Sequence, residues 1–262
     1  MSIKWLLLLS SICACASAAM LINAGVKGFC RGAEGNKLLL ILTGFLLSPA
    51  GLVFIALNLG QPSRILFLLS HITAPFSLMV LSQAIVTILC LLSVFMAKNR
   101  FNQKVLALLC LLGGLFYALA AGRFYMIFTR PALNHYIVVL LILIFICATA
   151  SHISFCQDKR CKLLKLFLMS LFAICFSVFV IRIGYLGNAD KLLQIQSLFS
   201  GAVSGIFCII IAAFAIALIS DYLMIKRAEK LFHFLALSCC FVAGAGVIYL
   251  FNITENIVKT MY

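Results

Sequence analysis

Charged residues are scarce in this sequence of 262 residues: they make up 10% of it, and only 6 residues are acidic. An ordinary soluble domain is about one quarter charged and about half apolar. Here hydrophobic types make up 65% of the chain, and its mean hydropathy is +1.23. Internal repeats, low-complexity tracts and long polar linkers are also lacking. These deficits exclude a soluble globular protein, a disordered chain, a coiled coil and a secreted disulfide scaffold.

Long apolar runs dominate the sequence instead. A helix that crosses a bilayer needs roughly 20 apolar residues. We therefore predict an all-α polytopic membrane protein, a bundle of eight transmembrane helices that makes one integral membrane domain over residues 1–262. Pro75 predicts where the third helix starts. The expected spans cover residues 5–25, 38–58, 75–97, 105–128, 134–156, 164–187, 196–220 and 231–251.

Basic residues predict the topology. Of the 20 Lys and Arg residues, 13 lie in the connections after the first, third, fifth and seventh spans, 5 lie on the opposite side, and Arg123 and Arg182 fall within spans. Loops rich in Lys and Arg stay in the cytoplasm, so both termini are expected on the periplasmic side. The basic excess then reflects topology, and nucleic acid is not an expected partner. A signal peptide cleaved after Ala16-Ser17-Ala18 is the alternative, but it would reverse the bias of every later loop.

Cysteine and histidine do not form a metal signature. Most of the 12 cysteines fall within apolar spans, where a thiol packs as a small hydrophobe. No C-x-x-C occurs, so we expect neither a metal site nor an iron–sulfur cluster in this chain. His152 and His233 lie near the inner ends of two spans. A pair of haem ligands is the alternative there, but solvated interfacial histidines are favoured and no haem is expected. Small residues at Gly201–Gly205 and Cys240–Gly244 predict close helix packing.

Several polar side chains gather toward the outer ends of the expected spans. Asn58 ends the second span, Arg123 and Arg182 lie near the ends of the fourth and sixth, and Tyr125 follows Arg123 by two residues. Ionisable residues at membrane depth are costly and are therefore functional candidates. The alternative is that the arginines extend to the lipid headgroups. A lipid-soluble quinol fits such a layer, because its oxidation needs hydrogen-bond partners for two oxygens and an electron acceptor, here on another protein.

Three segments carry a family resemblance. Leu57–Arg64 reads LNLGQPSR, Thr73–Ser77 reads TAPFS, and Arg123–Tyr125 reads RFY and is followed by RPALN at Arg130–Asn134. The first resembles the L-H-L-G-x-P-x-R segment of the membrane-anchor subunit of dimethyl sulfoxide reductases, the DmsC type. The second resembles the start of that family's third span, and the last pair resembles its R-x-Y…R-P-A-W-N passage. The resemblance covers mainly residues 50–150.

The resemblance implies a role in anaerobic respiration. Such a chain anchors a molybdopterin catalytic subunit and an iron–sulfur electron-transfer subunit to the bacterial inner (cytoplasmic) membrane. It is not itself the catalytic subunit, but it binds menaquinol and passes the electrons to the iron–sulfur subunit. The expected quinol-binding residues are Asn58, Arg64, Ser77, Arg123, Tyr125 and Arg130.

Two departures from the family pattern concern proton chemistry. Asn58 stands where the family usually has a histidine tied to quinol oxidation, and asparagine accepts no proton at neutral pH. Leu78-Met79 stands where the family usually has Arg-Glu. His71 and His135 are the candidate proton acceptors that remain. A structural anchor that has lost quinol oxidation is therefore an alternative. A small-solute transporter is another, although no inverted repeat is apparent.

Overall fold

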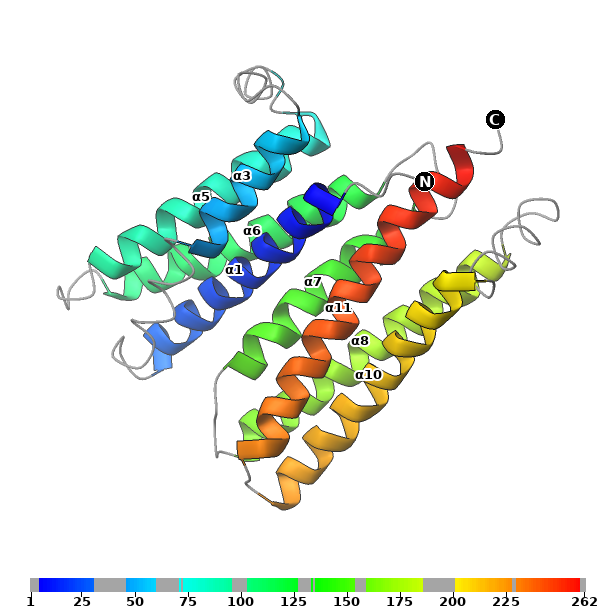
Figure 1. The fold of residues 1–262 in the computed structure, drawn as a ribbon. Coiled ribbons are helices and arrows are strands. Elements are labelled where there is room, and N and C mark those ends of the chain that lie inside the picture. Colours follow the sequence, from blue (N-terminus) through cyan, green and yellow to red (C-terminus); the bar gives the residue numbers. More distant parts are fainter. Residues whose placement is uncertain are drawn as a thin grey trace. The chain divides into compact units, whose positions relative to one another are not determined.

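The structure, a computed structural model, describes residues 5–30, 46–59, 71, 73–95, 103–126, 133, 135–153, 159–185, 201–227 and 230–259. These residues form eight α-helices (Figure 1). In chain order the helices are α1 (Trp5–Cys30), α3 (Ser48–Asn58), α5 (Pro75–Phe95), α6 (Gln103–Tyr125), α7 (Tyr136–Ile153), α8 (Lys159–Tyr185), α10 (Gly201–Lys226) and α11 (Lys230–Lys259). The predicted all-α class is confirmed, and α5 begins at Pro75 as the sequence predicts.

Seven of these helices are long and apolar enough to cross a membrane. The shortest of the seven, α7, has 18 residues, which at 1.5 Å per residue extend about 27 Å, close to the hydrocarbon thickness of a bilayer. The chain is therefore a multi-pass membrane protein. The remaining helix, α3, has 11 residues in the described part of the chain. An eighth crossing over residues 38–58 and the periplasmic termini stay predictions.

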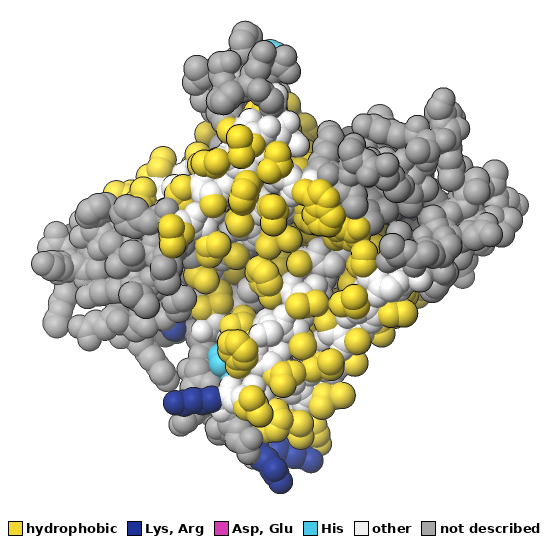
Figure 2. All heavy atoms as spheres, viewed as in Figure 1, with side chains coloured by type: hydrophobic (Ala, Val, Ile, Leu, Met, Phe, Trp, Pro, Cys, Tyr) yellow, Lys and Arg dark blue, Asp and Glu magenta, His cyan; other side chains and the backbone are white. Residues whose placement is uncertain are grey.

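Large apolar side chains cover the outer faces of the helices. Phe167, Ile174 and Phe234 are each more than half exposed. In Figure 2 the described side chains in view are mostly hydrophobic, with Lys and Arg side chains near the lower edge. An apolar surface of this extent does not suit water, and it matches contact with lipid.

The chain divides into two compact units, which we call the N-terminal unit (Lys4–Phe124) and the C-terminal unit (Tyr125–Tyr262). The N-terminal unit holds α1, α3, α5 and α6 up to Phe124. The C-terminal unit holds α7, α8, α10 and α11. The expectation of one integral membrane domain stays a prediction.

Helices α1 and α6 of the N-terminal unit pack antiparallel at very close range. A Cβ atom on Gly25 would lie 2.7 Å from the carbonyl oxygen of Ala107, and one on Gly114 would lie 2.5 Å from the Ile22 side chain. Real Cβ atoms do not approach neighbours so closely, so both positions need glycine. Close backbone approach over small residues is a common way for membrane helices to associate without a hydrophobic driving force.

Helices α3 and α5 are joined by buried polar contacts. The Ser48 and Thr87 hydroxyls share a hydrogen bond, and the Gln83 side-chain amide donates to the Ser48 carbonyl at 3.2 Å. A Cβ on Gly51 would collide with that same amide. Residue 48 meets residue 87 while residue 51 meets residue 83, so the two helices run antiparallel.

Helices α5 and α6 also run antiparallel. Ser93 Oγ lies 3.1 Å from Cys110 Sγ near one end, and the rings of Phe76 and Phe124 lie 5.4 Å apart near the other. The start of α5 and the end of α6 therefore lie together. Since α3 is antiparallel to α5, its last turn is at this end of the unit too.

The C-terminal unit is a closed bundle of four helices. Helix α7 packs on α8, α8 on α10, α10 on α11, and α11 returns to α7 (Figure 1). Aromatic rings fill its interior in a chain of contacts, made by Phe145, Phe172, Phe214, Phe176 and Phe207, with Phe179, Phe251 and Tyr125 in a second group. In this bundle the ends of α7 and α10 lie beside the starts of α8 and α11, as the hydrogen bonds described below require.

The two predicted packing seams have different outcomes. On α11, Cys240 is fully buried and a Cβ on Gly244 would overlap the ring of Phe145 on α7, so this seam is confirmed. On α10, a Cβ on Gly205 would meet nothing within 4 Å in the described part of the chain. The prediction of close packing is therefore wrong at Gly205, because the small-residue pattern does not specify which helix face meets a neighbour.

Candidate functional site

Three of the expected quinol-site residues lie at one end of the N-terminal unit. Asn58 is the last residue of α3, Ser77 is the third of α5, and Arg123 is two residues before the end of α6. The hydrogen bond between Ser48 and Thr87 places these two residues at the same height in the antiparallel pair α3 and α5. Asn58 comes ten residues after Ser48 on α3, and Ser77 comes ten residues before Thr87 on α5. Both therefore lie at a similar height, at the same end of the pair. The ring contact between the start of α5 and the end of α6 brings Arg123 to the same end.

Ser77 has an unusual environment for a hydroxyl. Its side chain is 3% exposed, and its Oγ has no hydrogen-bond partner among the described residues. Buried polar atoms in native proteins are nearly always paired. The neighbouring Phe76 packs its ring against Phe124. The start of α5 thus combines an unpaired hydroxyl with an aromatic wall.

Two other buried polar atoms of this unit lack a partner within the described ranges. One is Oε1 of Gln83, whose Nε2 donates to the Ser48 carbonyl, and the other is Oγ of Ser10. Both residues approach Gly51, which the Gln83 amide and the Ser10 carbonyl flank. The Gln83 side chain is fully buried.

The two outer residues of the Arg123–Tyr125 motif have different surroundings. The Arg123 side chain is exposed, whereas Tyr125 is 3% exposed and its ring lies 5.6 Å from that of Phe251 in the C-terminal unit. The other two expected arginines, Arg64 and Arg130, lie outside the described residues.

The two candidate proton acceptors also differ. His71 is exposed, whereas His135 is half-buried and its Nδ1 accepts a hydrogen bond from the backbone N–H of Ile137 at 3.1 Å. This bond caps the start of α7, where the first N–H groups have no partner within the helix. A neutral ring that accepts at Nδ1 carries its proton on Nε2. His135 can therefore take up a proton only by giving up the cap.

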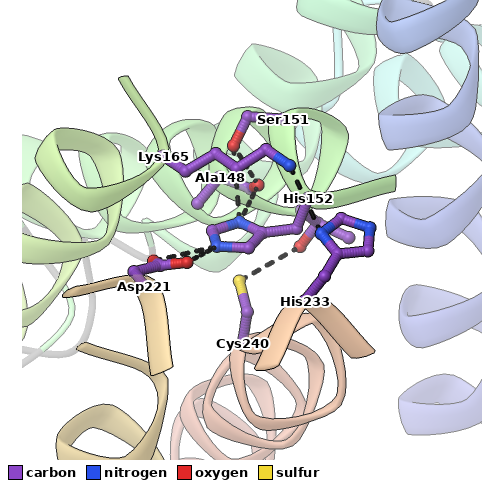
Figure 3. A network of polar contacts seen from close by, with 8 residues as sticks. Ala148, Ser151, His152, Lys165, Asp221, His233 and Cys240 are labelled. Carbon is purple, nitrogen blue, oxygen red and sulfur yellow. Dashed lines mark hydrogen bonds and ion pairs between the residues drawn. The ribbon is translucent and has the colours of Figure 1, made fainter. Parts of the chain in front are cut away.

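The C-terminal unit contains a buried group of ionisable side chains that the sequence pattern did not predict as a site (Figure 3). His152 of α7 and Asp221 of α10 are fully buried, and His152 Nε2 lies 3.0 Å from both carboxylate oxygens. Lys165 of α8 is 1% exposed, and its Nζ lies 3.3 Å from Nδ1 of His233 on α11. Each of the four helices supplies one of these side chains.

The hydrogen bonds of His152 define its proton count. Its Nδ1 lies 2.8 Å from the Ala148 carbonyl oxygen, and because a carbonyl only accepts, Nδ1 must carry a proton. One further proton is then needed between Nε2 and the Asp221 carboxylate. That proton resides either on the imidazole, which gives an ion pair, or on the carboxyl group, which gives a neutral pair. The net charge of the pair is zero in both cases.

The two pairs lie close enough to affect each other. His152, Asp221 and Lys165 all act electrostatically on His233. Asp221 also acts on Cys240, whose thiol lies 3.7 Å from the Thr149 hydroxyl. The four ionisable side chains therefore form one group, which we call the His–Asp–Lys–His cluster.

This cluster corrects two expectations. His152 is fully buried and paired, so the prediction of a solvated interfacial histidine is wrong for it. Both of its ring nitrogens are engaged, which leaves neither for a haem iron. The expected seventh span stops at residue 220, whereas α10 continues to Lys226 and carries Asp221 into the bundle. The sequence contains only one signal for this pair: His152 and Asp221 lie toward the same side of the membrane, at the ends of two expected spans.

No metal site was predicted from the sequence of this chain. Within the described ranges, no group of three or more His, Cys, Asp and Glu side chains is arranged to hold a metal ion. The cysteines described there are all free thiols.

Comparison with known proteins assigns no family. No protein-family model matches the chain, and no curated protein matches it significantly.

Proposed function

We propose that this chain is the membrane-anchor subunit of a respiratory molybdoenzyme of the dimethyl sulfoxide reductase type in the bacterial inner membrane. In this role it binds menaquinol and passes the electrons to an iron–sulfur partner subunit, which serves a molybdopterin catalytic subunit. The proposal is supported by the motif segments over residues 57–64, 73–77 and 123–134 and by the multi-pass helical fold. The observation that carries it is the buried Ser77 hydroxyl, which has no hydrogen-bond partner among the described residues and lies at the end of the N-terminal unit where Asn58 and Arg123 also lie.

The chemistry of these residues fits a quinol. A quinol oxygen can donate to or accept from the Asn58 amide and the Ser77 hydroxyl, and the Arg123 guanidinium donates. The Phe76 and Phe124 rings offer an apolar wall for the fused rings of menaquinol. Binding of a quinol hydroxyl would also pair the Ser77 oxygen, which removes the cost of leaving it unsatisfied.

A structural anchor without quinol oxidation is the second candidate, and one observation favours it. Asn58 cannot take a proton, and the Nδ1 atom of His135 is engaged in the cap of α7. If no group near the quinol accepts protons, the chain would still anchor its partner subunits but would not oxidise the quinol.

Binding of a quinol is tested directly on the full chain in lipid nanodiscs. We expect a fluorescent menaquinol analogue to be quenched on binding, and Ser77→Ala to weaken the affinity about 2- to 10-fold, the value of one hydrogen bond. Ser93→Ala is the matched control, since Ser93 lies at the opposite end of α5 and bonds to Leu89 and Cys110. Equal affinity of both variants and the wild type, or no quenching at all, would contradict the proposed site.

Electron transfer needs the complex with the partner subunits. We expect Arg123→Ala to lower menaquinol-dependent reduction of the iron–sulfur subunit while the complex still assembles. Lys104→Ala, an exposed cation at the other end of α6, should leave the rate unchanged. A wild-type complex that assembles but is not reduced by menaquinol would select the structural anchor instead.

A further inference from the structure

The His–Asp–Lys–His cluster lies outside the proposed quinol site and does not depend on it. Buried ion pairs are poor stabilisers, because apolar groups of the same volume often stabilise a fold as well or better. Ionisable side chains within membrane helices instead mark proton or ion pathways by default. We propose that His152, Asp221, Lys165 and His233 form a proton-binding site inside the C-terminal bundle, which exchanges a proton with water at the end where α7 and α10 end and α8 and α11 begin (Figure 3).

The pair of His152 and Asp221 has room for one more proton. In its resting state Nδ1 holds a proton for the Ala148 carbonyl, and one proton is shared between Nε2 and the carboxylate. Uptake of a proton places one on Nε2 and another on the carboxyl group, and the net charge of the pair rises from zero to +1. Release returns the shared proton, so the step makes and breaks only N–H and O–H bonds.

Access to water follows from the helix ends. His152 is one residue from the end of α7, and Asp221 is five residues from the end of α10, which is about 7.5 Å along the helix. His233 is the half-buried member, three residues into α11. Its Nδ1 accepts from the ammonium of Lys165, whose side chain is 1% exposed. The exchange with water that we propose therefore takes place on the side of the cluster where His233 lies.

The charges around the pair keep an added proton exchangeable. Lys165 faces the cluster from α8, and Lys162, one turn earlier on the same helix, is 6% exposed. Among the described residues, Asp221 also interacts electrostatically with the Cys240 thiol and with His233 on α11. The Lys165 ammonium in the cluster disfavours a lasting extra positive charge on the pair. The proton is therefore bound reversibly and is not trapped.

The wild-type protein provides the first test. The full chain in lipid nanodiscs is examined by infrared difference spectroscopy as the medium is changed between about pH 8 and pH 5, the range in which histidine-coupled sites change charge. We expect the C=O stretch of a protonated, buried carboxyl group to appear on acidification if the resting pair is ionic, or to shift in frequency if the carboxyl group already holds the shared proton, and either change should reverse on return. A carboxyl signal that is the same at both ends of the range would show a fixed structural pair and overturn the proposal.

Variants assign the signal. Asp221→Asn should remove the band, Asp221→Glu should keep it at a shifted frequency, and His152→Gln should change the pH at which it appears. Ser177→Ala is the matched control, since this exposed serine of α8 bonds only within its own helix, to Ala173. If Asp221→Asn does not fold, the frequency shift in Asp221→Glu makes the assignment alone. A band that persists unchanged in these Asp221 variants belongs to another acid and would overturn the proposal.

Discussion

Asp221 is the residue with the most demanding environment in the C-terminal unit. A charged side chain within a membrane helix costs up to about 3 kcal/mol by insertion measurements, the value found at the helix centre. Asp221 is fully buried and both of its oxygens face His152. The pairing of Asp221 with His152 compensates the cost of burying a charge only while both residues are present, because removal of one leaves the other buried without a partner.

Removal of one residue of this pair should therefore destabilise the fold. We expect Asp221→Ala to lower the free energy of unfolding by about 3–5 kcal/mol, the usual effect of breaking a buried pair. The measurement is denaturation of the purified chain in mixed micelles, followed by circular dichroism. Ser177→Ala should change the stability by less than about 0.5 kcal/mol, as exposed substitutions do. A similar effect of both substitutions would mean that the pair contributes nothing to folding.

Asn58 is the residue that limits proton chemistry in the N-terminal unit. A histidine at this position can accept a proton near neutral pH, whereas an amide cannot. We expect Asn58→His to raise menaquinol-dependent reduction of the partner complex on the order of 100-fold, the lower range for a general base. Asn58→Gln keeps the amide and should not raise it. An unchanged rate in Asn58→His would place the proton acceptor elsewhere.

At the scale of the helices, packing depends on a few glycine positions, where the neighbouring helix lies so close that a side chain has no room. Gly244 on α11 lies against the ring of Phe145 on α7, and Gly25 and Gly114 bring α1 and α6 together. In a bilayer the lipid tails are as apolar as the helices, so such close contacts replace the hydrophobic effect as the main source of association.

Two glycines of the C-terminal unit form a matched pair that tests whether close contact at a glycine stabilises the packing of helices. We expect Gly244→Ala to destabilise the unit by about 1–3 kcal/mol, because its methyl group would overlap the buried Phe145 ring. Gly205→Ala should be neutral or stabilise by up to about 1 kcal/mol, since it meets no neighbour and alanine favours a helix. Denaturation of both variants in mixed micelles provides the comparison, and equal stability would contradict the role of the contact.

At the scale of the whole molecule, the distribution of basic residues predicts the topology. The connections after the first, third, fifth and seventh spans hold 13 of the 20 Lys and Arg residues. The His–Asp–Lys–His cluster lies where α7 and α10 end, so this topology would place it on the cytoplasmic side.

Reporter fusions test that topology. We expect alkaline phosphatase joined after Tyr262 to be active and a green fluorescent protein at the same position to be dark, since the C-terminus is predicted to be periplasmic. A fluorescent protein joined after Lys226, with the rest of the chain removed, should be bright. The reverse pattern would contradict this topology and would fit either cleavage after Ala18 or a segment 38–58 that does not cross the membrane, because the loss of one span inverts every later loop.

Much of the fold was predictable because helix formation in a membrane is a local matter. Every backbone group in the bilayer must be paired within its own helix, so an apolar run of sufficient length is enough to predict α1 or α8. Pro75 fixed the start of α5 for the same local reason. The end of α10 was predicted too early, since the first charged residue does not end a helix when a partner from another helix compensates it.

The sites were predictable only in part. The sequence order and hydropathy alone placed Asn58, Ser77 and Arg123 near the ends of their helices, and antiparallel packing brings those ends together. The burial of Ser77 and the cap that occupies His135 are tertiary facts. Neither follows from the residue type, because both depend on which neighbour the side chain meets.

The amino-acid sequence by itself determined that this protein is helical, apolar and threaded through a membrane, since those properties depend on composition and on hydrogen bonds within single helices. Only the tertiary structure decided which polar side chains share a site. His152 and Asp221 are 69 residues apart, and Lys165 and His233 are 68 apart. Their meeting depends on how α7, α8, α10 and α11 pack, and no local pattern in the sequence encodes that arrangement.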